Sequence, residues 1–233
     1  MERVSESLQN KIMSASEAAS LIKSGMALAL SGFTMVGYPK AVLSSLAESG
    51  HADNLTLCVG AAVGDDVDGE LVRKGLVTRR FAHQTNNDLR KAINNGTVEY
   101  LDLHLSHFPM NINHHVSPRI DVAIIECVAV TEDGLYLTAA GGASDAAVRN
   151  ADIVIAEVNE TVPIELMGMH DVFEIGLPPE AKIIPITKPM DRVGTPYVPC
   201  PPEKLAAIVI TDKTDPPQKF KPVTDANQKI GEN

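Results

Sequence analysis

The segment from Met26 to Glu48 constrains the fold most, because it predicts a buried strand, a tight turn and a helix in immediate succession. Met26–Leu30 is an apolar run, and the turn after it contains Gly32 and Gly37, which permit positive φ or a close approach to a ligand. Pro39 suits the first turn of the helix. Because the N–H groups at a helix start can hold negative charge, the segment is also a candidate anion site.

The same alternation of strand and helix repeats along the chain. Ser14–Glu17 is a capping box that opens a first helix, and Gly25 ends that helix. The clearest central strands are 121–126 and 152–157. We therefore predict an α/β fold of three layers (α/β/α), with a mostly parallel, Rossmann-like sheet covered on both faces. The remaining predicted elements are strands at 55–59, 79–82, 98–103 and 205–210, and helices at 69–74, 87–94 and 144–149.

The chain has 233 residues, of which 44% are hydrophobic and 4% aromatic, so we expect one domain with an aliphatic core. Prolines are frequent from Pro178 to Pro202, and a helix cannot run through that stretch. We place the domain at residues 1–212. The polar segment 213–233 is expected to be a linker or tail that leads toward a further, carboxy-terminal half.

Charge and cysteine content exclude several classes of partner. A net charge of −10 argues against nucleic acid, whose binding needs a basic face. The sequence contains neither a signal-peptide pattern at its start nor an apolar run of the ~18 residues that span a membrane. The three cysteines lie far apart, which suits a reducing compartment without disulfides. We expect a cytoplasmic protein, with an organellar matrix as the alternative.

The histidines suggest a metal site at first sight. His104, His107, His114 and His115 are close in sequence, but their spacing matches no helical metal motif, and the stretch is typical of a strand end running into a loop. We therefore predict no metal, with His114 and His115 in solvent. For His170, a structural role in a loop is favoured over proton transfer.

Two acidic strand ends and a second glycine turn have competing interpretations. Glu126 and Glu157 each follow a strand-like run; we favour helix capping or salt bridging over a nucleophilic role. The turn 138–145 could hold a phosphate, or Asp145 could cap the helix that follows the turn. Capping is favoured because Asp145 would repel an anion.

Five motifs, in this order, carry a resemblance to a known family. They are Ser31–Lys40 (SGFTMVGYPK), Ile120–Glu126, Thr131–Gly134, Gly168–Asp171 and Asp191–Tyr197 (DRVGTPY). Together they resemble the acetyl-CoA hydrolase/transferase family, whose members include succinyl-CoA:acetate CoA-transferases. The similarity covers nearly the whole chain.

The resemblance implies that the chain is the amino-terminal half of an acyl-CoA:carboxylate CoA-transferase. In this family a glutamate on the carboxy-terminal half attacks the thioester, giving a mixed anhydride and then a glutamyl-CoA thioester. The implied partners are an acyl-CoA, a small carboxylic acid, that carboxy-terminal half and further copies in a homo-oligomer. Coenzyme A thioester enters as substrate, and no permanently bound cofactor is implied. Either a longer protein or a separate polypeptide would supply the nucleophile.

The candidate site combines two features: backbone amides of the glycine turn, which can stabilise the oxyanion of acyl transfer and which the resemblance places facing the nucleophile, and Arg192, whose guanidinium can grip a carboxylate or the phosphates of CoA. The alternatives are a turn selected only for its geometry, and an Arg192 that pairs with Asp191. A non-catalytic domain that binds a small anion or a partner chain is the alternative function. The candidate oxyanion contacts are Gly32 and Phe33, and the candidate substrate-binding residues are Thr34, Gly37, Arg192, Gly194 and Thr195.

Overall fold

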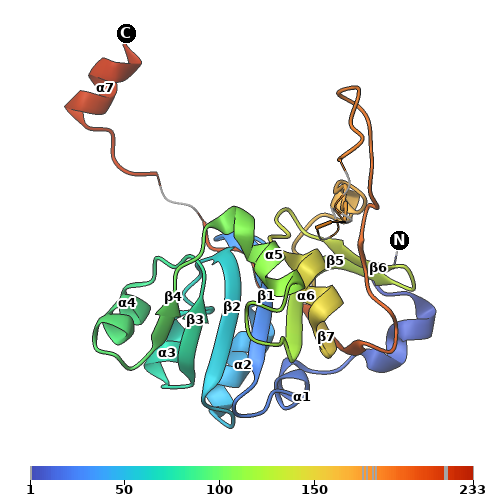
Figure 1. Cartoon of the computed structure of the whole chain (residues 1–233), viewed down its shortest axis with the longest axis horizontal. Coiled ribbons are helices and arrows are strands. Elements are labelled where there is room, and N and C mark those ends of the chain that lie inside the picture. Colours follow the sequence, from blue (N-terminus) through green and yellow to red (C-terminus); the bar gives the residue numbers. More distant parts are fainter. Residues whose placement is uncertain are drawn as a thin grey trace.

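The computed structural model describes residues 2–174, 176, 178–179, 181, 183–217 and 220–232. The strands are β1 (Ala27–Thr34), β2 (Leu55–Ala62), β3 (Val77–Phe81), β4 (Glu99–Leu101), β5 (Val122–Thr131), β6 (Gly134–Leu137), β7 (Ile153–Asn159), β8 (Val198–Pro199) and β9 (Leu205–Thr211). Parallel pairing gives the order β4-β3-β2-β1-β5-β7-β9 (Figure 1). Antiparallel β6 pairs with the second half of β5, and β8 pairs with β6.

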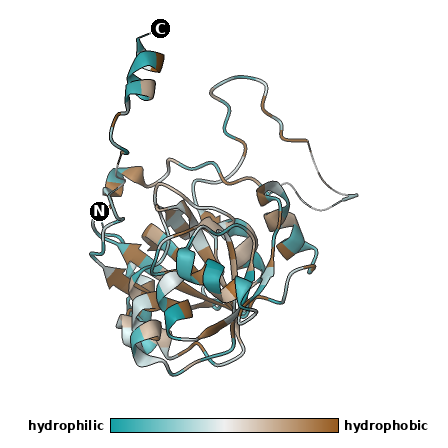
Figure 2. Cartoon of the chain, turned by 90° about the vertical axis from the view of Figure 1, so that its left-hand side faces the viewer, coloured by the Kyte–Doolittle hydropathy of each residue, from teal (hydrophilic) through white to brown (hydrophobic). Residues whose placement is uncertain are grey.

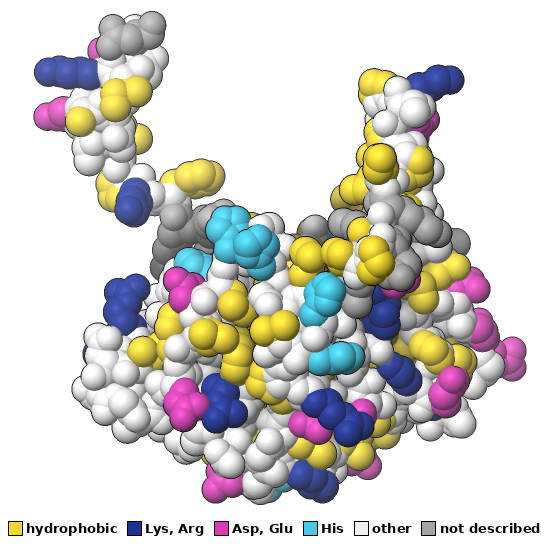
Figure 3. Space-filling view, viewed as in Figure 1, with side chains coloured by type: hydrophobic (Ala, Val, Ile, Leu, Met, Phe, Trp, Pro, Cys, Tyr) yellow, Lys and Arg dark blue, Asp and Glu magenta, His cyan; other side chains and the backbone are white. Residues whose placement is uncertain are grey.

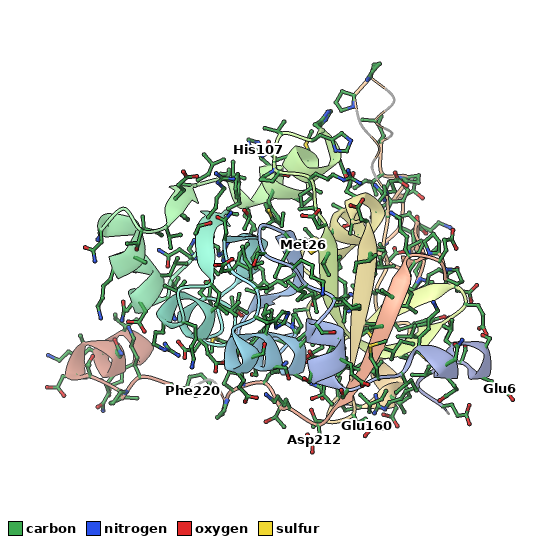
Figure 4. All side chains as sticks on the ribbon, turned by 90° about the horizontal axis from the view of Figure 1, so that it is seen from below. Glu6, Met26, His107, Glu160, Asp212 and Phe220 are labelled. Carbon is green, nitrogen blue, oxygen red and sulfur yellow. The ribbon has the colours of Figure 1, made fainter. Side chains whose placement is uncertain are left out.

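Helices cover both faces of this sheet. The helices are α1 (Ala15–Ala19), α2 (Ala41–Ser49), α3 (Gly69–Arg73), α4 (Asn87–Asn94), α5 (Phe108–Asn113), α6 (Ser144–Asn150) and α7 (Asp225–Gly231), with 3₁₀ turns η1 (Glu6–Lys11), η2 (Leu105–His107) and η3 (Ile164–Leu166). Apolar residues of α1 to α4 share one buried cluster, and those of α5 and α6 share the other. Viewed end-on, α5 lies on one side of the sheet and α2 on the other (Figure 4).

The two faces of the sheet receive different side chains because successive strand residues point in opposite directions. In β1, Leu28 and Leu30 join the cluster under α2, while Ala29 joins the cluster under α6. The strands are largely hydrophobic and lie inside the molecule (Figure 2). The core is mostly aliphatic, with Tyr38, Phe81 and Phe108 as its buried aromatic side chains among the described residues.

The predicted three-layer α/β fold is confirmed, and α4 has the predicted bounds, 87–94. The capping box of Ser14 and Glu17 is also present, with both reciprocal hydrogen bonds. The prediction of a loop around the four histidines was wrong, because η2 and α5 occupy residues 105–113. Pro109, in the first turn of α5, fits a helix start there. The antiparallel hairpin formed by β5 and β6 was also not predicted from the sequence.

Two further corrections concern helix starts. Pro39 precedes the N-cap of α2, which is Lys40, so it lies just outside the first turn. The N-cap of α6 is Ala143, so Asp145 lies in the first helical turn and does not cap it. Asp145 instead approaches Arg149, one turn later, at 4.0 Å. The predicted start of α6 at residue 144 is confirmed.

The direction of the strand order reverses at the boundary between β1 and β5. From β1, the chain adds β2, β3 and β4 on one side; from β5, it adds β7 and β9 on the other. Ligands in open α/β sheets bind outside the carboxyl ends of the strands at such a switch point. The turn Ser31–Gly37 and the end of the parallel part of β5 at Glu126 both lie there.

Within the described part of the chain, none of the helices has the length and apolar character needed to cross a membrane. After β9 ends at Thr211, the chain runs to α7, which extends away from the sheet and has no buried residue in the described part (Figure 1).

Candidate active site at the carboxyl edge of the sheet

The glycine turn, residues 31–37, folds back on itself at the end of β1. The Phe33 N–H donates to the Val36 carbonyl at 3.0 Å, and the Val36 N–H donates to the Phe33 carbonyl at 3.2 Å. Thr34 has φ of 55°, which is unusual for a β-branched residue and marks local backbone strain. The carbonyl of Thr34 accepts a hydrogen bond from the Val63 N–H, which ties the turn to the end of β2.

This turn packs directly against the second glycine turn, 138–145. Gly37 has φ of 71°, and a Cβ there would lie 2.2 Å from the Ala140 carbonyl oxygen. A Cβ on Gly142 would lie 2.5 Å from the Gly32 carbonyl oxygen. Glycine is therefore required on both sides of the contact. The sequence indicated two separate glycine turns, and the tertiary structure joins them.

A buried polar network lies beneath the glycine turn. Ser31 Oγ donates to the Gly37 carbonyl at 2.8 Å and accepts from the Glu126 N–H at 2.8 Å, which connects β1 to β5. The Glu126 carboxylate pairs with Lys40 Nζ, and Lys40 is 2% exposed. Thr138 Oγ1 and Asn159 Nδ2 also donate to Glu126, each at 3.2 Å.

Burial dominates the electrostatics of this network. Burial raises the pKa of Glu126 to about 7, against the opposing attraction of Lys40. Burial alone would lower the pKa of Lys40, but the negative charges of Glu126 and Asp215 outweigh burial and raise that pKa. Lys40 therefore stays charged, while Glu126 titrates near neutrality.

Glu157, at the end of β7, caps α2 from across the sheet. Its carboxylate accepts the N–H groups of Lys40, Ala41 and Val42 at 2.7, 2.9 and 3.0 Å. The expectation that this helix start could hold a ligand anion is therefore corrected, because an internal carboxylate occupies it. The capping or salt-bridging role predicted for Glu126 and Glu157 is confirmed.

A cavity opens beside the glycine turn, at the carboxyl ends of β1, β2 and β3. Its volume is about 710 Å³. Phe33 and Thr34 form one wall, and the exposed face around it combines hydrophobic side chains with histidines (Figure 3). The remaining lining residues are Ala61, Val63, His83, Thr85, Asp102, Leu103, His104 and Leu105.

The predicted site residues fall into two groups. Gly32, Phe33, Thr34 and Gly37 lie together in the glycine turn, with Phe33 and Thr34 at the cavity. The Phe33 amide is engaged by Val36, so it could meet an oxyanion only if that hydrogen bond opened. The Gly37 N–H is directed at the carboxylate of Asp215, at 3.4 Å.

The second group lies in the Asp191–Tyr197 loop. Arg192 Nη1 donates to the carbonyls of Gly168 and His170 at 2.9 and 3.1 Å, and Asp171 accepts from the Gly194 N–H at 2.7 Å. Thr195 pairs with Val172 through backbone hydrogen bonds, and with Gly194 it lines a separate cavity of about 480 Å³ beside α6. His170 contacts the Thr138 carbonyl, as expected for a structural histidine.

The histidines around α5 are exposed, as predicted for His114 and His115. The rings of His104 and His107 lie 5.3 Å apart. Among the described residues, no group of three or more His, Cys, Asp or Glu side chains could hold a metal ion.

Sequence reasoning missed Lys40, Asn159 and Asp215. Lys40 stands directly before an apolar helix in the sequence, where a buried lysine would require an acidic partner, and the structure does bury it. That signal could have linked Lys40 to the acidic strand ends. No sequence pattern pointed to Asp215, because it lies in the polar segment after the last strand.

Comparisons with known proteins identify the family. The N-terminal domain of acetyl-CoA hydrolase/transferase matches residues 1–210. The chain is 43% identical over 231 residues to succinyl-CoA:acetate CoA-transferase of Clostridium kluyveri, covering 97% of this chain and 43% of the relative. It is 36% identical over 221 residues to acetyl-CoA hydrolase of Schizosaccharomyces pombe, covering 89% and 42%. The chain thus spans less than half the length of these relatives.

Solved structures share the fold at low identity. RipA from Yersinia pestis has a TM-score of 0.65 and 17% identity, covering 93% of this chain and 46% of that one. Glutaconate coenzyme A-transferase from Acidaminococcus fermentans has a TM-score of 0.60 and 17% identity, covering 87% and 76%. Sequence and fold agree: the chain belongs to the acetyl-CoA hydrolase/transferase family and carries its N-terminal domain.

Proposed function

We propose that this chain is the amino-terminal half of an acyl-CoA:carboxylate CoA-transferase or acyl-CoA hydrolase, and that its glycine turn forms one wall of the acyl-transfer site. The observation that carries the proposal is the position of the turn, which lies at the topological switch point beside a cavity of about 710 Å³. The curated relatives are named for both activities.

In this proposal the turn supplies donors to the oxyanion that forms when the thioester is attacked. Gly32 and Gly37 let the backbone come close to the reacting carbonyl, and the proposed donors are the Gly32 amide and the Phe33 amide, the latter once its hydrogen bond to Val36 opens. Such a donor contributes on the order of 3 kcal/mol to transition-state stabilisation. The nucleophilic glutamate is proposed to lie on the carboxy-terminal half of the same enzyme.

The cavity beside Phe33 and Thr34 is proposed to take the small acid or acyl group. Its lining combines apolar side chains with the polar groups of Thr34, His83, Thr85, Asp102 and His104. Arg192, Gly194 and Thr195 lie in another loop, so their proposed role is to bind a more distant part of the acyl-CoA. Coenzyme A thioester is a substrate in this scheme. The buried free thiols of Cys58, Cys127 and Cys200 support a reducing compartment such as the cytoplasm.

The test compares the 233-residue chain alone with the same chain joined to its carboxy-terminal half, using succinyl-CoA and acetate. We expect acetyl-CoA formation only from the joined protein. In that protein, Gly37→Ala should reduce kcat/KM roughly 100-fold, because the added Cβ would push the glycine turn away from the second turn. Gly25→Ala, also at positive φ but with nothing within 4 Å, is the matched control. Activity from the chain alone would refute the proposal that the nucleophilic glutamate lies on the carboxy-terminal half.

A further inference from the structure

The chain after β9 stays on the sheet edge before it leaves the domain. We call residues 212–217 the strap. The Lys213 carbonyl accepts from Asn159 Nδ2 at 2.8 Å, and Lys213 Nζ donates to Ser44 Oγ at 3.0 Å. In Figure 4, Asp212 at the start of the strap and Phe220 beyond its end both lie on the side of the sheet that α2 covers. The strap is therefore held to both the end of β7 and the α2 helix.

Asp215 joins the strap to the glycine turn. Its Oδ1 lies 2.8 Å from Lys40 Nζ, and its Oδ2 accepts from the Gly37 N–H at 3.4 Å. The Asp215 side chain is 25% exposed, whereas Lys40 is buried. A half-buried ion pair of this kind is less screened by water and salt than a surface pair. The contact thus links the strap to the glycine turn, which the proposed function places at the acyl-transfer site.

Two carboxylates share one buried ammonium group. Glu126 approaches Lys40 from β5 and Asp215 approaches it from the strap. When Glu126 is protonated, Asp215 is the carboxylate that pairs with the Lys40 ammonium group. When Glu126 is ionised, both carboxylates pair with Lys40 and repel each other. The other charged or titratable groups that face this cluster are Glu157 from β7, Tyr38 with its partner Asp66, Lys213 from the strap, and Cys127 beside Glu126 on β5.

We propose that Asp215 is a positioning residue, which orients the Gly37 amide and fastens the strap to the glycine turn through Lys40. This inference rests on the function proposed above, in which the chain continues from the strap toward the carboxy-terminal half. The strap would then fix, beside the glycine turn, the point from which the chain leaves the domain toward the second half. Asp215 acts through Lys40 and Gly37 and does not itself touch substrate.

The first test measures amide hydrogen exchange of Gly37 by NMR in the 233-residue chain. In Asp215→Asn we expect exchange to be roughly tenfold faster, because one charge-assisted hydrogen bond is lost. Asp212→Asn is the matched control, since Asp212 is exposed and lies three residues earlier in the same strap. Asp215→Glu should restore part of the protection, and it replaces Asp215→Asn if that variant fails to fold.

The second readout is the pH profile of the Gly37 amide shift. In the wild-type chain this shift should follow the titration of Glu126 near pH 7, because both groups contact the same lysine. In Asp215→Asn the midpoint should move to lower pH, since a repelling carboxylate has been removed. Asp212→Asn should keep the wild-type midpoint.

The third readout is catalysis by the chain joined to its carboxy-terminal half. Asp215→Asn should lower kcat roughly 10- to 100-fold relative to Asp212→Asn, with Asp215→Glu intermediate. Exchange, midpoint or kcat equal to those of Asp212→Asn would overturn the inference. If the wild-type joined protein is inactive, the proposed function fails, and the exchange and pH measurements decide the inference by themselves.

Discussion

At the scale of single residues, Gly37 satisfies two independent requirements. Its φ of 71° favours glycine, and the space that a Cβ would fill is taken by the Ala140 carbonyl. Gly25 has a similar φ of 84° but lies in open space, so it satisfies only the first requirement. The two positions therefore separate backbone strain from steric exclusion.

We predict that Gly25→Ala costs about 1 kcal/mol in the free energy of unfolding, from left-handed strain alone. Gly37→Ala should cost about 3 kcal/mol or more, because the two glycine turns must also separate. Urea denaturation of both variants measures the difference. Equal losses would show that the turns do not pack as described.

Glu126 gives a second residue-scale prediction. An unfolded glutamate titrates near 4.5, whereas burial raises the pKa of Glu126 to about 7 in the folded chain. The folded state therefore holds the proton more tightly, and its stabilisation is complete below pH 4.5 and is lost as pH rises to about 7. Relative to Glu126→Gln, the free energy of unfolding of the wild-type chain should fall by on the order of 3 kcal/mol between pH 4.5 and pH 7, and should change little above pH 7. Denaturation curves at pH 5 and pH 8 test this, and an unchanged difference would contradict it.

At the scale of elements, α2 is anchored by a cap that its own sequence does not supply. Glu157 on β7 accepts three N–H groups of the helix start, although it lies 115 to 117 residues further along the chain. The cap also fixes the direction in which the glycine turn enters α2. By contrast, α1 carries a local capping box, formed by Ser14 and Glu17.

We predict that Glu157→Gln destabilises the chain by about 1 to 3 kcal/mol, because its amide group would face an N–H donor without accepting from it. Glu17→Gln, in the exposed capping box of α1, should cost about 0.5 to 1 kcal/mol. Thermal and urea unfolding compare the two caps. A cost for Glu157→Gln no larger than that for Glu17→Gln would argue against the long-range cap.

At the scale of the whole molecule, the carboxyl edge of the sheet exposes apolar side chains next to the glycine turn. Phe33, Leu101, Leu105 and Met110 are between 41% and 46% exposed. Such a patch on a domain that spans less than half of its relatives is suited to contact with another domain or another copy.

We predict that the isolated chain self-associates through this edge. Sedimentation velocity should show a concentration-dependent increase in mass, and Leu105→Ser combined with Met110→Ser should abolish it, because both side chains belong to the patch. Phe220→Ser is the control, since Phe220 is 97% exposed but lies in the tail. A wild-type monomer at all concentrations would contradict the prediction.

The sequence alone determined the parallel strands, most of the helices and the layered α/β class, because apolar periodicity and local capping depend on neighbouring residues. It also indicated structural roles for Glu126 and Glu157. Only the tertiary structure decided that Glu157 caps α2, that Lys40 lies between Glu126 and Asp215, and that the two glycine turns touch. These contacts join residues from separate strands and the tail, so they depend on strand order and register, which no local pattern encodes.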